Sequence, residues 1–443
     1  DDPAMFSSQN EQDSRYYGRS AHLPVLEPSD AQECKDFVKL AFDLSEAYDT
    51  PVIVRVTTRI AHARSLVALG ERTPHAMPDW VKEPQKYVMM PGNARRRHPI
   101  VEEREKKLAK DASEMEINRA EMRDTALGVV CSGACYPYVR EAAPDASTFK
   151  LGMTYPLPKD ALRAFSQQVD RLVVIEELEP FLEDALNAMG IPASGKDRTG
   201  LQGELGVRKV KKALLGVEAP LPAAPPVVIR PPALCPGCPH RATFHVLKKR
   251  KLNVFGDIGC YTLGATPPLS AMDATLCMGA SIGMAFGAEK ARGRAFSRKS
   301  VAVIGDSTFL HSGVPALIDA VYNGGTITVL IVDNRITGMT GHQENPASGK
   351  DIYGKEAPRI DLEALCRGCG VLHVRKVDPL DHRALEKAIE EETAREAVSV
   401  IIAEAPCVLL TKEHPAPYAV EDCRDCGVCL KIGCPALSRG DAG

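Results

Sequence analysis

The clearest pattern in the chain is a pair of β-branched apolar runs, each ended by polar residues and joined by a helical segment. The first run, 301–304, stops at Gly305-Asp306-Ser307, and the second, 327–332, stops at Asp333-Asn334. Short apolar runs bounded by turn signals predict buried strands. Parallel strands joined by a crossover helix end at the same edge of a sheet. The pattern therefore predicts that Asp306 and Asn334 lie side by side.

The same reading predicts an α/β protein with several doubly wound domains. Between 126 and 190 the pattern alternates between strands and helices, which is typical of a small doubly wound domain. Outside these segments we expect helices at 31–48 and 101–123, and strands at 52–56, 252–255 and 398–403.

Composition suggests where these segments are divided. The stretch 219–232 (APLPAAPPVVIRPP) is proline-rich, which is typical of a stiff linker. We expect the chain to begin inside one domain, whose opening strands precede it, and to end inside another. The expected segments are 1–73, the rear part of an α/β domain; 74–125, a helical connector; 126–218, a small α/β domain; 219–232, the linker; 233–415, the domain of the central unit; and 416–443, a cysteine-dense segment.

Length and charge limit the functional classes. The 443 residues suggest roughly three or four domains, and 44% hydrophobic and 26% charged residues are ordinary globular values. A formal net charge of -3 gives no electrostatic reason to expect a nucleic acid or an anionic membrane as partner. No apolar run approaches the roughly 20 residues of a membrane span, and no signal peptide is recognised. We expect a soluble, cytoplasmic protein.

The two strand ends carry hard oxygen ligands. A carboxylate from Asp306, an amide oxygen from Asn334 and a nearby backbone carbonyl suit a magnesium ion that keeps its other positions for phosphate and water. An ordinary βαβ unit with polar strand ends is the alternative. The glycine-rich sequel at 337–342 favours the ligand site.

Fourteen cysteines occur in pairs and runs, which in a reducing compartment indicates metal binding before disulfides. The most specific run ends the chain, with two residues between the first three cysteines and a proline after the fourth. This spacing is typical of a 4Fe-4S cluster, whereas structural zinc rarely uses three evenly spaced thiolates. The expected ligands are Cys423, Cys426, Cys429 and Cys434.

A second thiolate pair, Cys235 and Cys238, is compatible with a zinc knuckle, a redox pair or a cluster. Cys260 and Cys407 each follow a predicted strand of the same sheet, so all four thiols could converge. The pair Cys366 and Cys369 competes for this role from a helix-to-loop segment. Cys131 and Cys135 are expected to be buried, small apolar residues.

The strand–helix–strand unit resembles the thiamine diphosphate motif, in which GDG is followed after some thirty residues by Asn. In that family the Asp, the Asn and the carbonyl two residues later hold magnesium under the diphosphate. The resemblance assigns these roles to Asp306, Asn334 and Ile336, with Ser307 where the motif usually has glycine. Met278 is either a core filler or the apolar wedge that holds the cofactor bent. Further cofactor-binding residues are expected among small residues at the same edge: Gly256, Asp257, Gly259, Cys260, Gly279 and Gly305.

Together, the stretches SSQNEQDSRYYGR, LCPGCPHRA, GDIGCYTLG and CMGASIGMAFG and the terminal CxxCxxCxxxxCP resemble the 2-oxoacid:ferredoxin oxidoreductases, most closely the α subunits of the indolepyruvate type. The resemblance implies thiamine diphosphate, Mg²⁺ and 4Fe-4S clusters as cofactors. It also implies oxidative decarboxylation of an aryl 2-oxoacid with coenzyme A and ferredoxin. The implied segments are pyrimidine-side, transketolase-C-like, diphosphate-binding and ferredoxin-like, and a separate β subunit is the implied partner in a hetero-oligomer.

The resemblance also assigns residues. It selects Cys235, Cys238, Cys260 and Cys407 as ligands of a cluster beside the cofactor, and Arg19 as the ligand of the substrate carboxylate, with Arg15 as the competitor. The family's catalytic glutamate is expected before the first residue, so no catalytic acid or base is assigned. The alternatives are a non-redox thiamine-dependent decarboxylase and an iron–sulfur electron carrier without thiamine chemistry.

Overall fold

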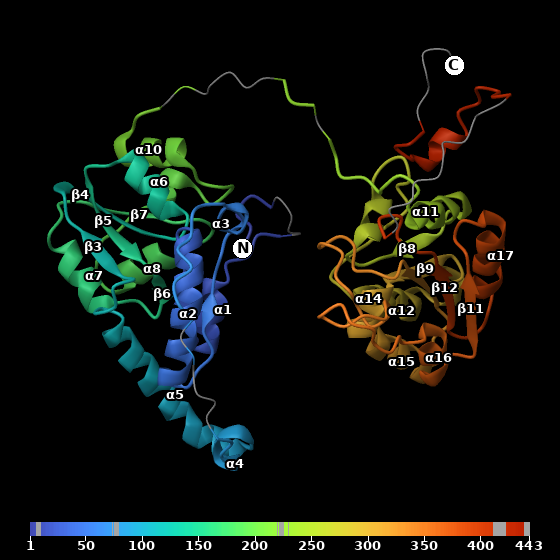
Figure 1. The fold of residues 1–443 in the computed structure, drawn as a ribbon, viewed down its shortest axis with the longest axis horizontal. Helices are drawn as coiled ribbons and strands as arrows, with labels where there is room; N and C mark the ends of the chain where they lie inside the picture. The colour runs from blue at the N-terminus through green and yellow to red at the C-terminus, as the bar shows by residue number, and fades with distance from the viewer. Residues whose placement is uncertain are drawn as a thin grey trace. The chain divides into compact units, whose positions relative to one another are not determined.

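The computed structural model describes residues 1–5, 10–72, 74, 79–218, 220, 226–228, 230–410 and 422–437. The chain divides into two compact units, Asp1–Pro226 and Val227–Gly443 (Figure 1). The division at 226 falls inside the proline-rich stretch that was expected to be a linker. Within the described ranges, no helix combines the length and the apolar character that crossing a membrane requires.

The second unit is built on a five-stranded parallel sheet of order β11-β12-β10-β9-β8. The central pair β9 and β10 is adjacent and in register, with Ile304 opposite Ile331 and Gly305 opposite Val332. This confirms the predicted arrangement of the two apolar runs. The strands are β8 (Asn253–Phe255), β9 (Ser300–Gly305), β10 (Thr328–Asp333), β11 (His373–Val377) and β12 (Ser399–Glu404).

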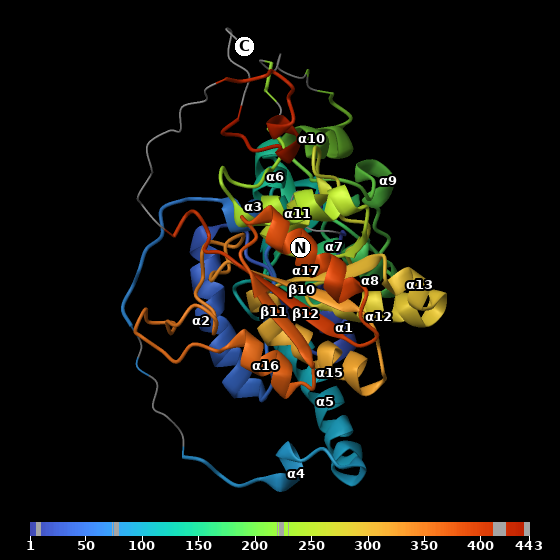
Figure 2. The ribbon, with the colours of Figure 1, turned by 90° about the vertical axis from the view of Figure 1, so that its right-hand side faces the viewer.

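Helices cover both faces of this sheet, which explains why its central strands are apolar without alternation. Successive residues of β9 point to opposite faces. Val301 and Val303 pack into the core beneath α11 and α17, and Ala302 and Ile304 pack into the core beneath α12 and α15. Figure 2 shows the sheet from the side of α17. The helices are α11 (Pro239–Arg250), α12 (Ala280–Arg292), α13 (Arg294–Ser297), α14 (Asp306–Thr308), α15 (Val314–Tyr322), α16 (Leu362–Gly368) and α17 (His382–Thr393), with single turns at Cys260–Ala265, Phe309–Gly313 and Cys429–Ile432.

The first unit contains a four-stranded sheet of order β3-β5-β4-β7 and a three-stranded sheet of order β2-β1-β6. Its strands are β1 (Val25–Leu26), β2 (Ile53–Val54), β3 (Arg119–Glu121), β4 (Asp124–Ser132), β5 (Ala146–Leu151), β6 (Met153–Tyr155) and β7 (Leu172–Ile175). Its helices are α1 (Arg15–Ala21), α2 (Ala31–Tyr48), α3 (Thr58–His62), α4 (Pro84–Tyr87), α5 (Pro91–Asp111), α6 (Cys135–Ala142), α7 (Lys159–Ser166), α8 (Phe181–Ala188), α9 (Lys196–Thr199) and α10 (Val207–Leu215).

The helix expected at 31–48 is confirmed as α2. Asp30 caps its first turn by accepting a hydrogen bond from the N–H of Glu33 at 2.8 Å. The helix ends at Asp49, whose φ of 52° is left-handed.

The helix expected at 101–123 was wrong in its bounds. The observed α5 starts ten residues earlier, with Pro91 in its first turn, and ends at Asp111. Asn118 fixes the exit, because its amide nitrogen donates to the carbonyl of Ala112 and its oxygen accepts the N–H groups of Gly152 and Met153, all at 2.9 Å. The chain then enters β3, an edge strand paired antiparallel with β5.

Strand β5 was not predicted, although all six of its residues are buried. Its sequence ASTFKL carries Ser147, Thr148 and Lys150, which hide the apolar signal. The ammonium group of Lys150 is compensated by an ion pair with Glu33. Tertiary pairing therefore overrides the local pattern in this strand.

Candidate functional site

The candidate cofactor site is a hollow of about 80 Å³ at the carboxyl ends of β9 and β10. Ligands in open α/β sheets bind at this edge. Of the predicted cofactor residues, Gly256, Asp257 and Gly279 do not line the hollow. Those that line it are Gly259, Cys260, Met278, Gly305, Asp306, Ser307, Asn334 and Ile336.

Asp306 follows β9 directly and is only 3% exposed. Its Oδ2 accepts a hydrogen bond from the amide of Asn345 at 3.2 Å. Burial, together with the nearby carboxylate of Asp333, raises the pKa of Asp306 to about 7. No described cationic side chain forms an ion pair with Asp306. This carboxylate is therefore buried without a compensating charge, an environment that a bound cation would complete.

Asn334 follows β10 directly and is also buried. Its Oδ1 accepts the N–H of Ile336 at 3.3 Å, and its Nδ2 lies 3.3 Å from Nε2 of His240. Burial lowers the pKa of His240 to about 4, so the neutral ring can accept this hydrogen bond. These contacts orient the amide at the strand end. Carboxylate, amide and carbonyl oxygens at one sheet edge fit the preferences of magnesium.

Asp257 does not line the hollow but hydrogen-bonds to Tyr261, which does, and to Gly279, next to the lining residue Met278. Its carboxylate is fully buried and accepts the hydroxyl of Tyr261 and, at 3.2 Å, the N–H of Gly279. Burial raises the pKa of Asp257 to about 6. Gly279 has a φ of 90°, and a Cβ added there would lie 2.2 Å from Oγ of Ser312. This glycine turn places Met278, 46% exposed, at the rim of the hollow.

The structure brings Cys235, Cys238, Cys260 and Cys407 into one neighbourhood beside this hollow. Burial, together with the thiols of the other three cysteines, raises the pKa of Cys238 to about 11. Cys260 lines the hollow. The N–H of Cys407 donates to the carbonyl of Asn334 at 3.0 Å. Even so, in the described part of the chain no three His, Cys, Asp or Glu side chains are arranged to hold a metal ion.

The remaining cysteine pairs are separate from these four. Cys366 is fully buried in the core beneath α12 and α15, and burial raises its pKa to about 12. Cys131 and Cys135 are buried in the core of the first unit, as expected for small apolar residues.

Of the terminal cysteines, Cys423, Cys426 and Cys429 are exposed and Cys434 is half-buried. The segment is attached to α11 through Arg241, which donates to the carbonyl of Gly433 at 2.5 Å. The cluster predicted for this segment stays a prediction.

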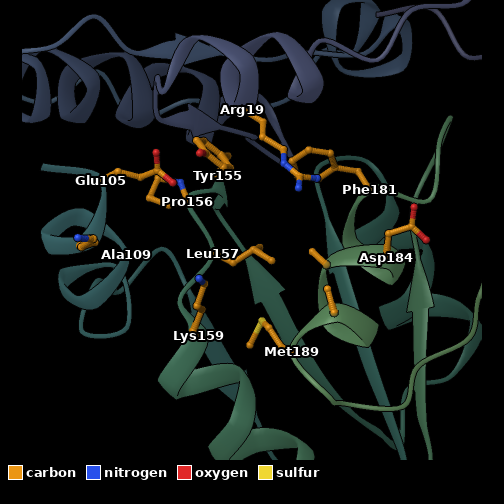
Figure 3. A pocket seen from close by; sticks show the side chains of 13 residues that line it. Arg19, Glu105, Ala109, Tyr155, Pro156, Leu157, Lys159, Phe181, Asp184 and Met189 are labelled. Carbon is orange, nitrogen blue, oxygen red and sulfur yellow. The ribbon is translucent and has the colours of Figure 1, made fainter. Parts of the chain in front are cut away.

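Arg15 and Arg19, the two arginines considered for the substrate, differ sharply in the first unit. Arg15 is 1% exposed and pairs with Asp13 at 2.5 Å and Glu176 at 2.6 Å. Arg19 is exposed, and no described residue forms a side-chain hydrogen bond or ion pair with it. It borders a cavity of about 480 Å³ (Figure 3). Of these two arginines, Arg19 is the one whose guanidinium has no hydrogen-bond or ion-pair partner among the described residues.

Sequence reasoning missed Asn345, His240 and Tyr261. Asn345 lies in a polar loop without periodicity, so nothing in its local sequence connects it to Asp306. Tyr261 directly follows Cys260, and His240 is two residues after Cys238. Proximity in sequence to these two predicted cluster ligands was the available signal.

Residues 257–403 match the family model of the thiamine pyrophosphate enzyme C-terminal TPP-binding domain. The parallel sheet and its strand-end site thus belong to the class of thiamine diphosphate enzymes. The chain is 38% identical over 476 residues to the indolepyruvate oxidoreductase subunit IorA of Archaeoglobus fulgidus, covering 99% of this chain and 75% of the relative. The same identity holds for the subunit IorA of Methanothermobacter marburgensis, with 100% and 76% covered. The chain belongs to the indolepyruvate oxidoreductase subunit IorA family and is part of an oxidoreductase.

Among solved structures, a 2-oxoglutarate:ferredoxin oxidoreductase from Magnetococcus marinus is similar to 40% of this chain and 65% of its own, with 18% identity and a TM-score of 0.35. The family assignment rests on the sequence relatives and not on this similarity.

Proposed function

We propose that this chain is the thiamine-diphosphate-bearing subunit of an enzyme that oxidatively decarboxylates aryl 2-oxoacids of the indolepyruvate type. In this reaction the 2-oxoacid loses carbon dioxide, coenzyme A takes the acyl group, and two electrons pass singly to two molecules of oxidised ferredoxin. The observation that supports the proposal is the hollow at the ends of β9 and β10. The buried oxygen atoms of Asp306 and Asn334 line it, and four cysteines lie beside it.

The oxygen ligands are assigned to the metal. Asp306, Asn334 and the carbonyl of Ile336 would hold Mg²⁺ at the diphosphate of the cofactor, and Met278 would press on it from the opposite wall. Thiamine diphosphate supplies the carbanion-stabilising chemistry that decarboxylation requires. The protein's own contribution is to bind, to orient and to exclude water. His240 and Asn345 hydrogen-bond to the amide of Asn334 and the carboxylate of Asp306, and would position these two groups for the metal.

The thiols are assigned to electron transfer. Cys235, Cys238, Cys260 and Cys407 would hold a 4Fe-4S cluster next to the cofactor, since Cys260 belongs to both neighbourhoods. The terminal cysteines would hold another in a ferredoxin-like segment at 416–443. A cysteine loses its proton when it binds iron. Burial and the neighbouring thiols, which raise the pKa of Cys238, oppose this loss, and the positive charge of bound iron would offset that effect.

The remaining assignments follow the family. The segment 1–73 would belong to the pyrimidine-side domain, 126–218 to a transketolase-C-like domain and 233–415 to the diphosphate domain, joined by 74–125 and 219–232. The word "subunit" in the relatives' names supports a partner chain, a β subunit in a hetero-oligomer. The free guanidinium of Arg19 supports its role at the substrate carboxylate.

The test is an anaerobic assay of the purified complex of this chain and its partner subunit. Indolepyruvate, phenylpyruvate and pyruvate are supplied in turn, with and without coenzyme A, while reduction of methyl viologen is followed. The proposal expects coenzyme-A-dependent reduction that is faster with the aryl acids.

Other outcomes would overturn the proposal. Release of carbon dioxide without reduction of any acceptor would indicate a non-redox decarboxylase. Iron–sulfur spectra without turnover of any 2-oxoacid would indicate an electron carrier.

A further inference from the structure

The first unit carries a group of exposed apolar side chains that the proposed cofactor chemistry does not use. It lies on the segment 79–98, which contains α4 and the start of α5. Figures 1 and 2 both show these helices projecting beyond the sheets and the other helices of the unit. Every residue of this segment is described, and none of them is buried. We call this group the apolar tip, and its residues are Trp80, Val81, Tyr87, Val88, Met89 and Met90.

The side chains of the apolar tip are unusually large and exposed. Trp80 is the only tryptophan in the chain, and it is 84% exposed. Each of the others is at least 50% exposed. Single apolar residues on a surface need no explanation, but apolar side chains gathered on one projection mark an interaction site. Burial against a partner would remove them from water, which is favourable.

Contacts within the first unit hold the apolar tip in a defined conformation. The Trp80 ring stacks on the Tyr87 ring, with centroids 6.0 Å apart and planes 20° apart. The ammonium group of Lys86 lies 5.0 Å from the centroid of the Tyr87 ring and pairs at 2.6 Å with Asp49, at the end of α2. The side-chain amide of Asn93, in the first turn of α5, donates to the carbonyl just after α4 at 2.7 Å. A surface that is ordered before binding loses less conformational entropy when a partner docks.

The segment 79–98 is basic, although the whole chain has a formal net charge of -3. It contains five lysines and arginines but only two acidic residues, Asp79 and Glu83. Lys82 and Arg95 are exposed, and neither has an ion pair within the described ranges. Trp, Tyr, Met and Arg are also the residue types that are enriched in protein interfaces. The segment therefore combines large apolar side chains with available cations.

These charges decide between a second copy of this chain and a different protein. In a symmetric dimer through the apolar tip, the cations of one copy would face the same cations of the other. Like charges brought together across an interface cost free energy, whereas opposite charges favour association. The charge therefore favours a partner with an apolar groove surrounded by carboxylates. The proposed function already includes a separate protein that could provide such a groove, the partner subunit.

We propose that the apolar tip docks the partner subunit of the complex, in an apolar groove of that subunit that is flanked by carboxylates. Trp80, Tyr87 and Met89 would fill the groove. Lys82 and Arg95 would face the carboxylates around it. The inference rests on the proposed function only in taking the partner to be the β subunit.

Because Trp80 is the only tryptophan in this chain, its fluorescence reports directly on the apolar tip. The full chain is produced with 5-hydroxytryptophan, whose emission can be excited apart from the tryptophans of an unlabelled partner subunit. We expect the partner subunit to shift this emission to shorter wavelength and to reduce its quenching by acrylamide, because docking removes the ring from water. Unchanged emission and quenching in the assembled complex would contradict the proposal.

Mass photometry of the diluted complex measures the Kd between the two subunits. We expect Trp80→Ala and Arg95→Glu each to raise this Kd by about tenfold or more. The matched controls are Phe42→Ala and Lys39→Glu, which change an exposed ring and an exposed charge on α2 and should bind as the wild type does. Added salt should weaken the wild-type complex more than the Arg95→Glu complex.

Several results would overturn the proposal. Equal Kd values for the wild type, the two tip variants and the two controls would show that the tip is not the docking surface. A dimer of the chain alone that is lost in Trp80→Ala would make a second copy the occupant. Binding to phosphatidylserine vesicles that is lost in both tip variants would assign the tip to a membrane surface.

Two outcomes separate this inference from the proposed function. An active complex whose assembly does not depend on the apolar tip contradicts the inference alone. A complex that assembles through the apolar tip but turns over no 2-oxoacid contradicts the proposed activity alone.

Discussion

Arg15 and Arg19 lie one helical turn apart on α1 and have opposite environments. Arg15 is enclosed with two carboxylates, and its Nη2 also donates to the carbonyls of Glu177 and Glu179 at 3.0 and 3.2 Å. Arg19 has none of these contacts. The difference separates a residue that stabilises the unit from a residue that is free to bind.

The two arginines should therefore differ in their effect on stability. Arg15→Gln removes the closest cation from the buried Asp13 and Glu176 carboxylates, although Arg55 remains 3.9 Å from Asp13. Breaking a buried ion pair in this way typically costs about 3–5 kcal/mol. Arg19→Gln removes no side-chain hydrogen bond or ion pair among the described residues and should leave stability unchanged. Urea unfolding of both variants measures the difference. An equal loss in the two would contradict the assignment of their environments.

For single residues, the sequence predicted the location of those that directly follow a strand. Asp306 and Asn334 were predicted to be neighbours because each directly follows an apolar run, and the strands are indeed adjacent. Asn345 was not found, because a loop without periodicity brings it to Asp306. The buried ion pair of Arg15 could not be predicted either, because Glu176 is far away in sequence and contacts Arg15 only through tertiary packing.

At the scale of the elements, helix α12 begins after Gly279, a position that only glycine can occupy without strain. Gly279→Ala would place a side chain in the left-handed region and against Ser312, and should cost about 1–3 kcal/mol. Gly283→Ala is the matched control, because it lies inside the same helix with open space around it. It should stabilise by about 0.5–1 kcal/mol. Thermal unfolding of both variants tests the pair, and equal effects would contradict it.

The contact between α11 and α17 should depend on pH. The rings of His245 and His382 have centroids 5.7 Å apart, and burial lowers the pKa of His245, with His382, Lys249 and Lys248 lowering it further. A histidine whose folded pKa lies below its unfolded value near 6.5 contributes stability that is present above that pH and lost below it. The free energy of unfolding should fall between about pH 7.5 and about pH 5.5.

His382→Gln should reduce this loss, because His382 has the largest effect on the pKa of His245 among the neighbouring charges. His311→Gln, at an exposed position, is the control and should not change the profile. A His382→Gln profile that matches the wild type would contradict the coupling.

Elements with a continuous or one-sided apolar pattern were predictable, and those defined by distant partners were not. Strands β9 and β10 and helix α2 appear where their patterns placed them. Strand β5 was missed because Lys150 is neutralised by Glu33 from another element. The end of α5 was misplaced because the side chain of Asn118 stops it through bonds to β6 and to the residue before it.

For the whole molecule, the four thiols near the hollow predict a specific iron content. Cys407→Ser should lower the iron of the anaerobically purified complex by about four atoms, the content of one cubane. Cys366→Ser removes a thiol from the separate core and should retain all the iron. Iron analysis with low-temperature spin resonance measures both. Unchanged iron in Cys407→Ser with loss in Cys366→Ser would move the cluster to the other pair.

The family assignment and the strand-end geometry converge on one claim, that the edge of β9 and β10 holds thiamine diphosphate through magnesium. Calorimetric titration of thiamine diphosphate into the full chain, with and without Mg²⁺, tests it most directly. The account predicts Mg²⁺-dependent binding that weakens in Asp306→Asn by on the order of 100-fold, or about 2.7 kcal/mol. Asp319→Asn, on the exposed side of α15, should bind as the wild type does. Wild-type affinity in Asp306→Asn, or equal binding without Mg²⁺, would contradict the claim.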